Sequence, residues 1–187
     1  MSSNFYEIRD RAKGFFDQAK SAITMLESAK AEAEQAQAEV NAAYYAVQAA
    51  QSQVNSARYS EDEDGSEAYY AQAALESAQS QYMAAQAQLS AANQRVNSII
   101  QVLQNCIKGL YQCIQDAETG KQSLEVLQAK LGAYSSNRYM NTAQGNDLKA
   151  QTQNKIALFG KLISTCRQCI SFIQNAMNNG MERERER

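Results

Sequence analysis

Alanine and larger apolar residues recur along the first third of the chain at the alternating three- and four-residue spacing of a coiled coil. Two series of positions seven residues apart share one face of a helix: Phe15, Ala22, Ala29, Ala36, Ala43, Ala50 and Ala57, and Ala12, Ala19, Leu26, Ala33, Val40, Val47 and Val54. The pattern predicts a long helix from about Asn4 to Tyr59. Asn4 is a suitable N-cap, and Glu7 stands three residues later as its capping-box partner.

A second pattern of the same kind runs from Ala68 to Leu131 and keeps its phase over nine heptads. Its two series are Ala71, Ala78, Ala85, Ala92, Ile99, Cys106, Cys113, Gly120 and Leu127, and Ala68, Leu75, Tyr82, Leu89, Val96, Leu103, Leu110, Ala117, Leu124 and Leu131. We expect a second long helix with a bend or break at Gly120, because glycine is a poor helix former. Gly132 is expected as its C′ residue.

The segment between the two helices, residues 60–66, is acidic and holds one glycine, which is typical of a tight helical-hairpin loop. Folding the chain at this loop brings the two faces into register. Ala50 then meets Leu75 and Val47 meets Ala78. The same register pairs Ala43 with Tyr82, Ala29 with Val96, Phe15 with Leu110 and Ile8 with Ala117. Small residues oppose large ones in most pairs, which supports the register because the choice of loop does not impose this match.

A third helix is expected from Asn146 or Asp147 to Met177, with the apolar face Thr152, Ile156, Phe159, Ile163, Cys166, Ile170, Ile173 and Met177. Large apolar residues gather in this third helix, in the N-terminal part of the first helix and in the C-terminal part of the second. We therefore predict an all-α fold: a long antiparallel Ala-rich helical hairpin (a coiled-coil arm) that continues into a three-helix bundle. The predicted arm should extend about 45 Å at ~1.5 Å per residue. One elongated domain is expected over residues 1–180, with a bundle base (4–28, 97–132 and 146–178), an arm (29–96) with its tip loop at 60–66, and then a charged tail (181–187).

The composition narrows the classes of function. The 187 residues include no proline, tryptophan or histidine, and the formal charge is −2 without a basic cluster. We therefore expect no contact with nucleic acid. No unbroken apolar run approaches the ~20 residues that span a bilayer, so no transmembrane segment is expected. The N-terminus lacks the features of a signal peptide, which favours a cytoplasmic protein, with export by a non-classical route left open.

Four cysteines raise the question of a metal or redox site. Cys166 and Cys169 form a CxxC pair, but they lie in mid-helix rather than at the helix N-terminus, where the dipole lowers a thiol pKa. Cys106 and Cys113 are seven residues apart, about 10 Å along a helix, too far to share one tetrahedral ion. We expect no metal and no cofactor, and we interpret the cysteines as small core residues. Folding the third helix onto the second also places Cys113 opposite Cys166, as facing thiols or a disulfide.

The hairpin tip is the candidate binding site. Tyrosine is favoured at protein interfaces, and an acidic run stands beside three tyrosines, so the candidate residues are Tyr59, Glu61, Asp62, Glu63, Asp64, Tyr69 and Tyr70. A solvated loop with tyrosines covering the helix ends is the alternative interpretation. The acidic run does not have the ligand spacing of an EF-hand.

No catalytic motif is visible, and without histidine the commonest general acid–base is absent, so we expect no enzyme. The predicted function is that of a structural or adaptor coiled-coil protein that binds an unidentified protein partner as a monomer or weak homodimer. The first alternative is a secretion-linked helical module, the partner or N-terminal targeting part of an exported toxin. In shape alone the chain resembles the WXG100 and LXG helical hairpins; it has no tryptophan and hence no W-x-G. The second alternative is an α-helical pore-forming component.

Overall fold

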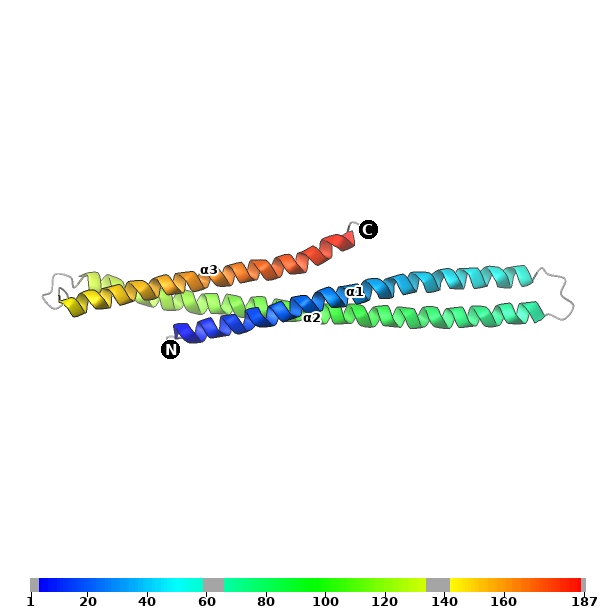
Figure 1. The fold of residues 1–187 in the computed structure, drawn as a ribbon, viewed down its shortest axis with the longest axis horizontal. Helices are drawn as coiled ribbons and strands as arrows, with labels where there is room; N and C mark the ends of the chain where they lie inside the picture. The colour runs from blue at the N-terminus through cyan, green and yellow to red at the C-terminus, as the bar shows by residue number, and fades with distance from the viewer. Residues whose placement is uncertain (1–3, 59–65, 134–141, 186–187) are drawn as a thin grey trace. The chain divides into compact units, whose positions relative to one another are not determined.

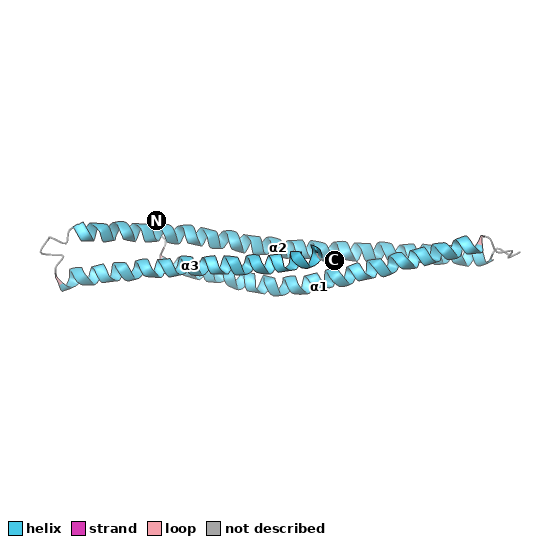
Figure 2. Ribbon diagram, turned by 90° about the horizontal axis from the view of Figure 1, so that it is seen from above, coloured by secondary structure: helices cyan, strands magenta, loops and turns pink. Residues whose placement is uncertain are grey.

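The computed structural model of the chain describes residues 4–58, 66–133 and 142–185. These residues form three helices, α1 (Phe5–Ala57), α2 (Ser66–Ala133) and α3 (Ala143–Arg185) (Figure 1). Within the described ranges there is no β-strand (Figure 2). The predicted all-α class is therefore confirmed. The absence of proline is what permits helices of 53 and 68 residues, since an interior proline costs roughly 3 kcal/mol.

The first helix begins at the predicted cap. The side-chain oxygen of Asn4 accepts a hydrogen bond from the backbone N–H of Tyr6 at 3.3 Å, and the Asn4 carbonyl accepts one from Ile8 at 3.2 Å. At α3 the prediction was three to four residues too late. The hydroxyl of Thr142 accepts a hydrogen bond from the backbone N–H of Gly145 at 3.3 Å, so Thr142 caps α3 in place of Asn146 or Asp147.

Of the bend or break predicted at Gly120, a break is excluded, because α2 is helical through Gly120. The helix also continues through Gly132, the predicted C′ residue, to Ala133. Gly120 lies under an aromatic ring of α3. A Cβ atom placed there would lie 2.8 Å from Cζ of Phe159. The glycine allows α2 and α3 to pack closely. Its low helix propensity does not interrupt α2. At the other end of the chain, α3 extends beyond Met177 to Arg185.

Two compact units make up the fold. The first consists of Met1–Ile23 with Gln101–Arg187, and the second of Thr24–Ile100. They are called the three-helix unit and the two-helix unit.

The three-helix unit has one core, to which α1, α2 and α3 all contribute side chains. Phe5 and Phe16 of α1 meet Phe159 and Phe172 of α3 with ring centroids 5.3 and 6.1 Å apart, so these two helices run in the same direction. Both run against α2 (Figure 1). The largest fully buried side chains of this core are Ile8, Leu103, Leu110, Ile173, Cys106, Cys113 and Cys166.

The two-helix unit has a core of smaller side chains. Ala50, Val54, Leu75 and Ala78 form a buried cluster, with Val47 and Ala71 packed against it. Further along, Arg95 of α2 donates a hydrogen bond to Glu32 of α1 at 2.8 Å. Because alanine buries little apolar surface, each turn of this unit gains less from the hydrophobic effect than a turn of the three-helix unit.

The composition of α3 overturns one expectation about partners. We expected only protein partners and no transmembrane segment, but the stretch Ala143–Asn178 is long and apolar enough to cross a membrane, with a mean hydropathy of 1.3 over 18 residues. Only 33% of that window is buried. The prediction was wrong because it was based on the absence of an unbroken apolar run. In α3 the apolar residues are interspersed with polar ones, and only the mean hydropathy of the window is high enough for a membrane span. The length and composition of α3 thus make it a candidate membrane span.

Candidate interaction surface

Two tyrosines project from the first turns of α2, where the two-helix unit ends. Tyr69 and Tyr70 are 72% and 71% exposed, and their rings meet edge to face with centroids 5.8 Å apart. Consecutive helical residues point about 100° apart, so the pair presents aromatic surface to two sides of the helix. The other predicted tip residues, Tyr59, Glu61, Asp62, Glu63 and Asp64, lie outside the described residues.

A second aromatic group lies further along the two-helix unit. Tyr44 packs against Tyr82 across the helix pair with ring centroids 6.1 Å apart, and it also accepts a hydrogen bond from Gln48 on its hydroxyl at 2.7 Å. Its neighbour Tyr45 is 70% exposed, as is Met83 at 68%. The heptad pattern of the sequence included Tyr82 but not Met83, which lies outside both series of core positions. Tyrosine and methionine are both enriched at protein interfaces.

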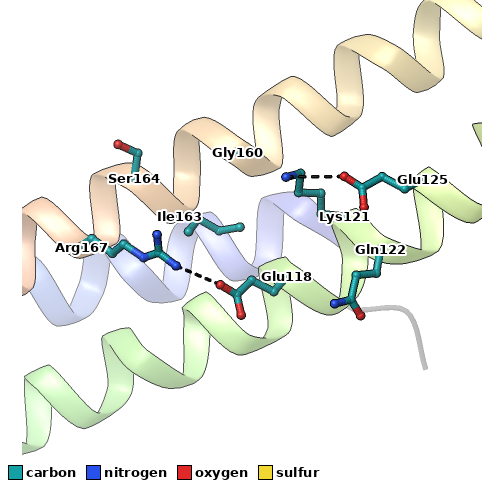
Figure 3. Close-up of a pocket in the computed structure, with 8 residues that line it drawn as sticks. All are labelled: Glu118, Lys121, Gln122, Glu125, Gly160, Ile163, Ser164 and Arg167. Atoms are coloured by element: carbon teal, nitrogen blue, oxygen red, sulfur yellow. Dashed lines mark hydrogen bonds and ion pairs between the residues drawn. The ribbon is translucent and has the colours of Figure 1, made fainter.

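The three-helix unit carries a shallow groove of about 440 Å³ between α2 and α3 (Figure 3). Its charged walls are two ion pairs: Arg167 with Glu118 at 3.1 Å, and Lys121 with Glu125 at 3.5 Å. The groove passes Gly160, where an added Cβ would meet nothing within 4 Å. Since the charges balance within the groove, it has no preference for a charged ligand. An isolated glycine in an apolar helix was its only signal in the sequence.

The four cysteines are free thiols in the core of the three-helix unit, with Cys169 partly exposed. Burial raises the pKa of all four thiols, and burial with the neighbouring Cys113 and Cys169 raises the pKa of Cys166 to about 11. They are therefore protonated near neutral pH and poor nucleophiles. The effect of Cys113 on Cys166 is consistent with the facing pair, which stays a prediction. Among the described residues, no three cysteine or carboxylate side chains are grouped so that they could hold a metal ion.

Comparison of the chain with protein-family models, curated proteins and solved structures gave no match.

Proposed function

We propose that this chain is a non-catalytic structural or adaptor coiled-coil protein that acts through protein–protein contacts. In this proposal residues 29–96 form an antiparallel coiled-coil arm that continues into a three-helix base, and the protein works in the cytoplasm. The observation that carries the proposal is the exposure of Tyr69 and Tyr70, each above 70%, side by side in the first turns of α2.

The physical reason is that tyrosine provides a large contact area for a small loss of side-chain entropy. Residues that dominate binding energy at interfaces are enriched in tyrosine, tryptophan and arginine. The tyrosine pair stands on continuous helix, which holds it more rigidly than a loop would. Catalysis has no comparable support, since histidine is absent from the sequence and the four thiols have raised pKa values.

The test is capture of partners from source-cell lysate by the immobilised full chain, with a Tyr69→Ser, Tyr70→Ser double variant alongside. If the tyrosine pair is the contact surface, the double variant loses the partner that the unmodified chain retains. The matched control is Tyr6→Ser with Tyr111→Ser, which removes two exposed tyrosines from the three-helix unit. Size-exclusion chromatography with light scattering then gives the mass of the complex.

Two results would contradict the proposal. One is capture that is equal for all three proteins, which would remove the tyrosine pair from the contact. The other is no complex with any protein. Recovery of the chain from the culture medium, bound to an exported protein, would favour the secretion-linked alternative.

A membrane-active helical component is the second candidate, and the hydropathy of α3 favours it. A single span would place Lys161 and Arg167 within the apolar stretch, each at a cost of about 2.5–3.5 kcal/mol near the bilayer centre. Dye release from anionic liposomes tests this candidate. Leu158→Asp, at an exposed leucine of α3, should abolish release, and Gln122→Asp, at an exposed position of α2 outside the apolar stretch, should retain it as the control. No release by the unmodified chain would exclude pore formation under those conditions.

A further inference from the structure

The core of the three-helix unit continues beyond the point at which α1 begins. Phe159 of α3 contacts both Phe5, the first residue of α1, and the backbone at Gly120 of α2. Beyond this level α2 continues to Ala133, and α3 has already run from Ala143. Figures 1 and 2 both show α1 starting part-way along the other two helices. We call residues 121–133 and 143–158 the open end.

Within the open end, α2 and α3 still pack on each other. Leu131 and Ile156 are buried, and the side-chain amide of Gln128 donates a hydrogen bond to Gln153 across the pair. Thr152 is also buried, with its hydroxyl satisfied by the Leu148 carbonyl at 2.8 Å. The pair is therefore a closed two-helix seam that lacks the third helix of the rest of the unit.

Apolar residues remain exposed where that third helix is missing. Leu127 follows Cys113 and Gly120 at intervals of seven, so it occupies the same core stripe, yet it is 40% exposed. Leu148 of α3 is 44% exposed. Around Cys113 and Gly120, α1 and α3 cover this stripe, and at Leu127 only α3 is present.

The charges of the open end indicate which kind of helix fits. One stripe of α2 meets α1 at Gly109, under Phe15, and at Asp116, which accepts a hydrogen bond from Arg11 at 2.5 Å. Two heptads after Asp116 the same stripe reaches Lys130, which is exposed and beyond α1. Arg11 of α1 pairs with the acidic Asp116 on this stripe. A helix that continued the line of α1 would therefore need an acidic residue to pair with Lys130.

The rest of the open end has the same sign. With Lys130 included, the open end holds four lysines and two acidic residues. Lys121 and Glu125 pair with each other on the groove side, and Asp147 accepts a hydrogen bond from Gln151 at 2.8 Å. Lys130 and Lys155 are exposed, and within the described residues neither forms an ion pair.

We propose that the open end binds an amphipathic helix of a partner protein, with apolar residues against Leu127 and Leu148 and acidic residues facing Lys130 and Lys155. The helix takes the place of a third helix along the line of α1. The 13 residues from 121 to 133 provide about 20 Å of surface, or three to four helical turns. A second copy of this chain fits less well, because its own open end would bring lysines against lysines. The inference deepens the proposed function by naming a partner class and a surface, and it does not depend on the tyrosine pair.

The test uses two fluorescein-labelled peptides of three heptads, with leucine at positions a and d and alanine at b, c and f. Positions e and g are glutamate in the acidic peptide and lysine in the basic one. Fluorescence anisotropy with the full chain should show the acidic peptide binding at least tenfold more tightly than the basic one. Leu127→Glu should weaken the acidic peptide at least tenfold. Lys130→Glu with Lys155→Glu should reverse the preference between the peptides.

The matched control is Gln122→Glu, which adds the same charge on the groove side of α2 and should leave binding unchanged. Circular dichroism of each variant shows that it is folded, and every substituted side chain is exposed. Equal binding of both peptides, no binding of the acidic one, or binding unaffected by Leu127→Glu overturns the inference. Dimerisation in analytical ultracentrifugation that Leu127→Glu abolishes also overturns it and assigns the surface to a second copy. Lysate capture that depends on Tyr69 and Tyr70 would leave the proposed function standing in all these cases.

Discussion

The ring of Phe15 lies over the backbone of Gly109, so close that a Cβ atom at position 109 would stand 2.5 Å from Cζ of the ring. The two Cε atoms of the ring would lie 2.6 Å away, so the outer edge of the ring occupies the space that a side chain at position 109 would need. Overpacking usually costs about 1–3 kcal/mol, and alanine returns about 1 kcal/mol in helix propensity. We therefore predict that Gly109→Ala lowers the free energy of unfolding by up to about 2 kcal/mol, the difference between the two effects. Urea denaturation followed by circular dichroism measures the difference.

Two other helical glycines provide the control. At Gly14 and Gly160 an added Cβ meets nothing within 4 Å. Alanine at either position should raise the free energy of unfolding by about 0.4–1 kcal/mol, because the unfolded chain loses freedom and the helix gains propensity. If all three substitutions had the same sign, the contact between Phe15 and Gly109 would not be an energetic feature of the protein.

An ion pair between α1 and α2 predicts a dependence of stability on acid. The hydrogen bond from Arg11 holds the pKa of Asp116 below its ordinary value of 3.8. A lowered pKa in the folded state stabilises the protein above pH 3.8, and this stabilisation is lost as the pH falls through the lower, folded value. Asp116→Asn should therefore remove part of the acid sensitivity and cost about 0.5–1 kcal/mol at pH 7, since the pair is partly exposed.

The measurement is urea denaturation at several pH values between about 2.5 and 7, a range that spans the titration of carboxylates. Asp10→Asn is the control, because Asp10 pairs with its sequence neighbour Arg9 and both side chains are more than half exposed. It should follow the unmodified protein at every pH. Parallel curves for all three proteins would show that the Arg11–Asp116 pair makes no contribution in solution.

The long helices and the N-cap of α1 could be predicted because their signals are local. The seven-residue spacing of Ala and Leu positions, and Asn4 before the first apolar residues, need no knowledge of the rest of the fold. Gly120 was misread because its role depends on Phe159, which is 39 residues away and reaches it only when α3 packs on α2. A glycine that breaks a helix and one that admits a neighbouring ring look the same in a sequence.

The candidate surfaces divide in the same way. Tyr69 and Tyr70 could be proposed because they stand beside a predicted loop. The groove at Gly160 could not, because it requires the relative position of α2 and α3. The open end had a usable signal: the predicted pairing of Ile8 with Ala117 implies that α2 outlasts α1 by about two heptads. The sequence could not show that the leucines and lysines of the open end are exposed, because this depends on how the three helices pack.

Burial of the thiols predicts a loss of stability in alkali. The pKa of Cys166 rises from 9.0 to about 11, and burial is the largest cause. A raised pKa in the folded state stabilises the protein below pH 9, and this stabilisation is lost between pH 9 and about 11 as the unfolded chain ionises first. The loss should be on the order of 2 kcal/mol. Cys166→Ala should therefore show a smaller fall in the free energy of unfolding over this range than the unmodified protein.

The two proteins are compared by the slope of the free energy of unfolding against pH. The core volume that Cys166→Ala removes lowers the free energy equally at every pH and does not change this slope. Ser164→Ala, two residues away at an exposed position of α3, should keep the original slope. If Cys166→Ala kept it as well, the Cys166 thiol would be no more buried in solution than in the unfolded chain.

The register of the predicted arm can be tested with engineered disulfides, in a background in which the four native cysteines are alanine and the helical content is first verified. Ala43→Cys with Tyr82→Cys should form an intramolecular disulfide under glutathione redox buffer. Ala43→Cys with Leu75→Cys should not, because seven residues move the second thiol about 10 Å along the helix and a disulfide needs Cα atoms about 4.4–6.8 Å apart. The contacts of Tyr44 with Tyr82 and of Glu32 with Arg95 support the first pairing.

Dilution distinguishes this disulfide from one between chains, since only the intramolecular bond forms at the same rate at every protein concentration. The opposite pattern, in which only the Ala43→Cys, Leu75→Cys variant forms the bond, would shift α2 by one heptad against α1. Leu75 would then oppose Ala43 in place of Ala50, and Tyr82 would move opposite Ala36. Small residues would still oppose large ones at these positions. The match of side-chain sizes in the sequence therefore supports antiparallel pairing of the two faces, but it does not distinguish registers that differ by one heptad. Contacts between distinct residues do, and the Glu32–Arg95 ion pair, lost in a one-heptad shift, is such a contact.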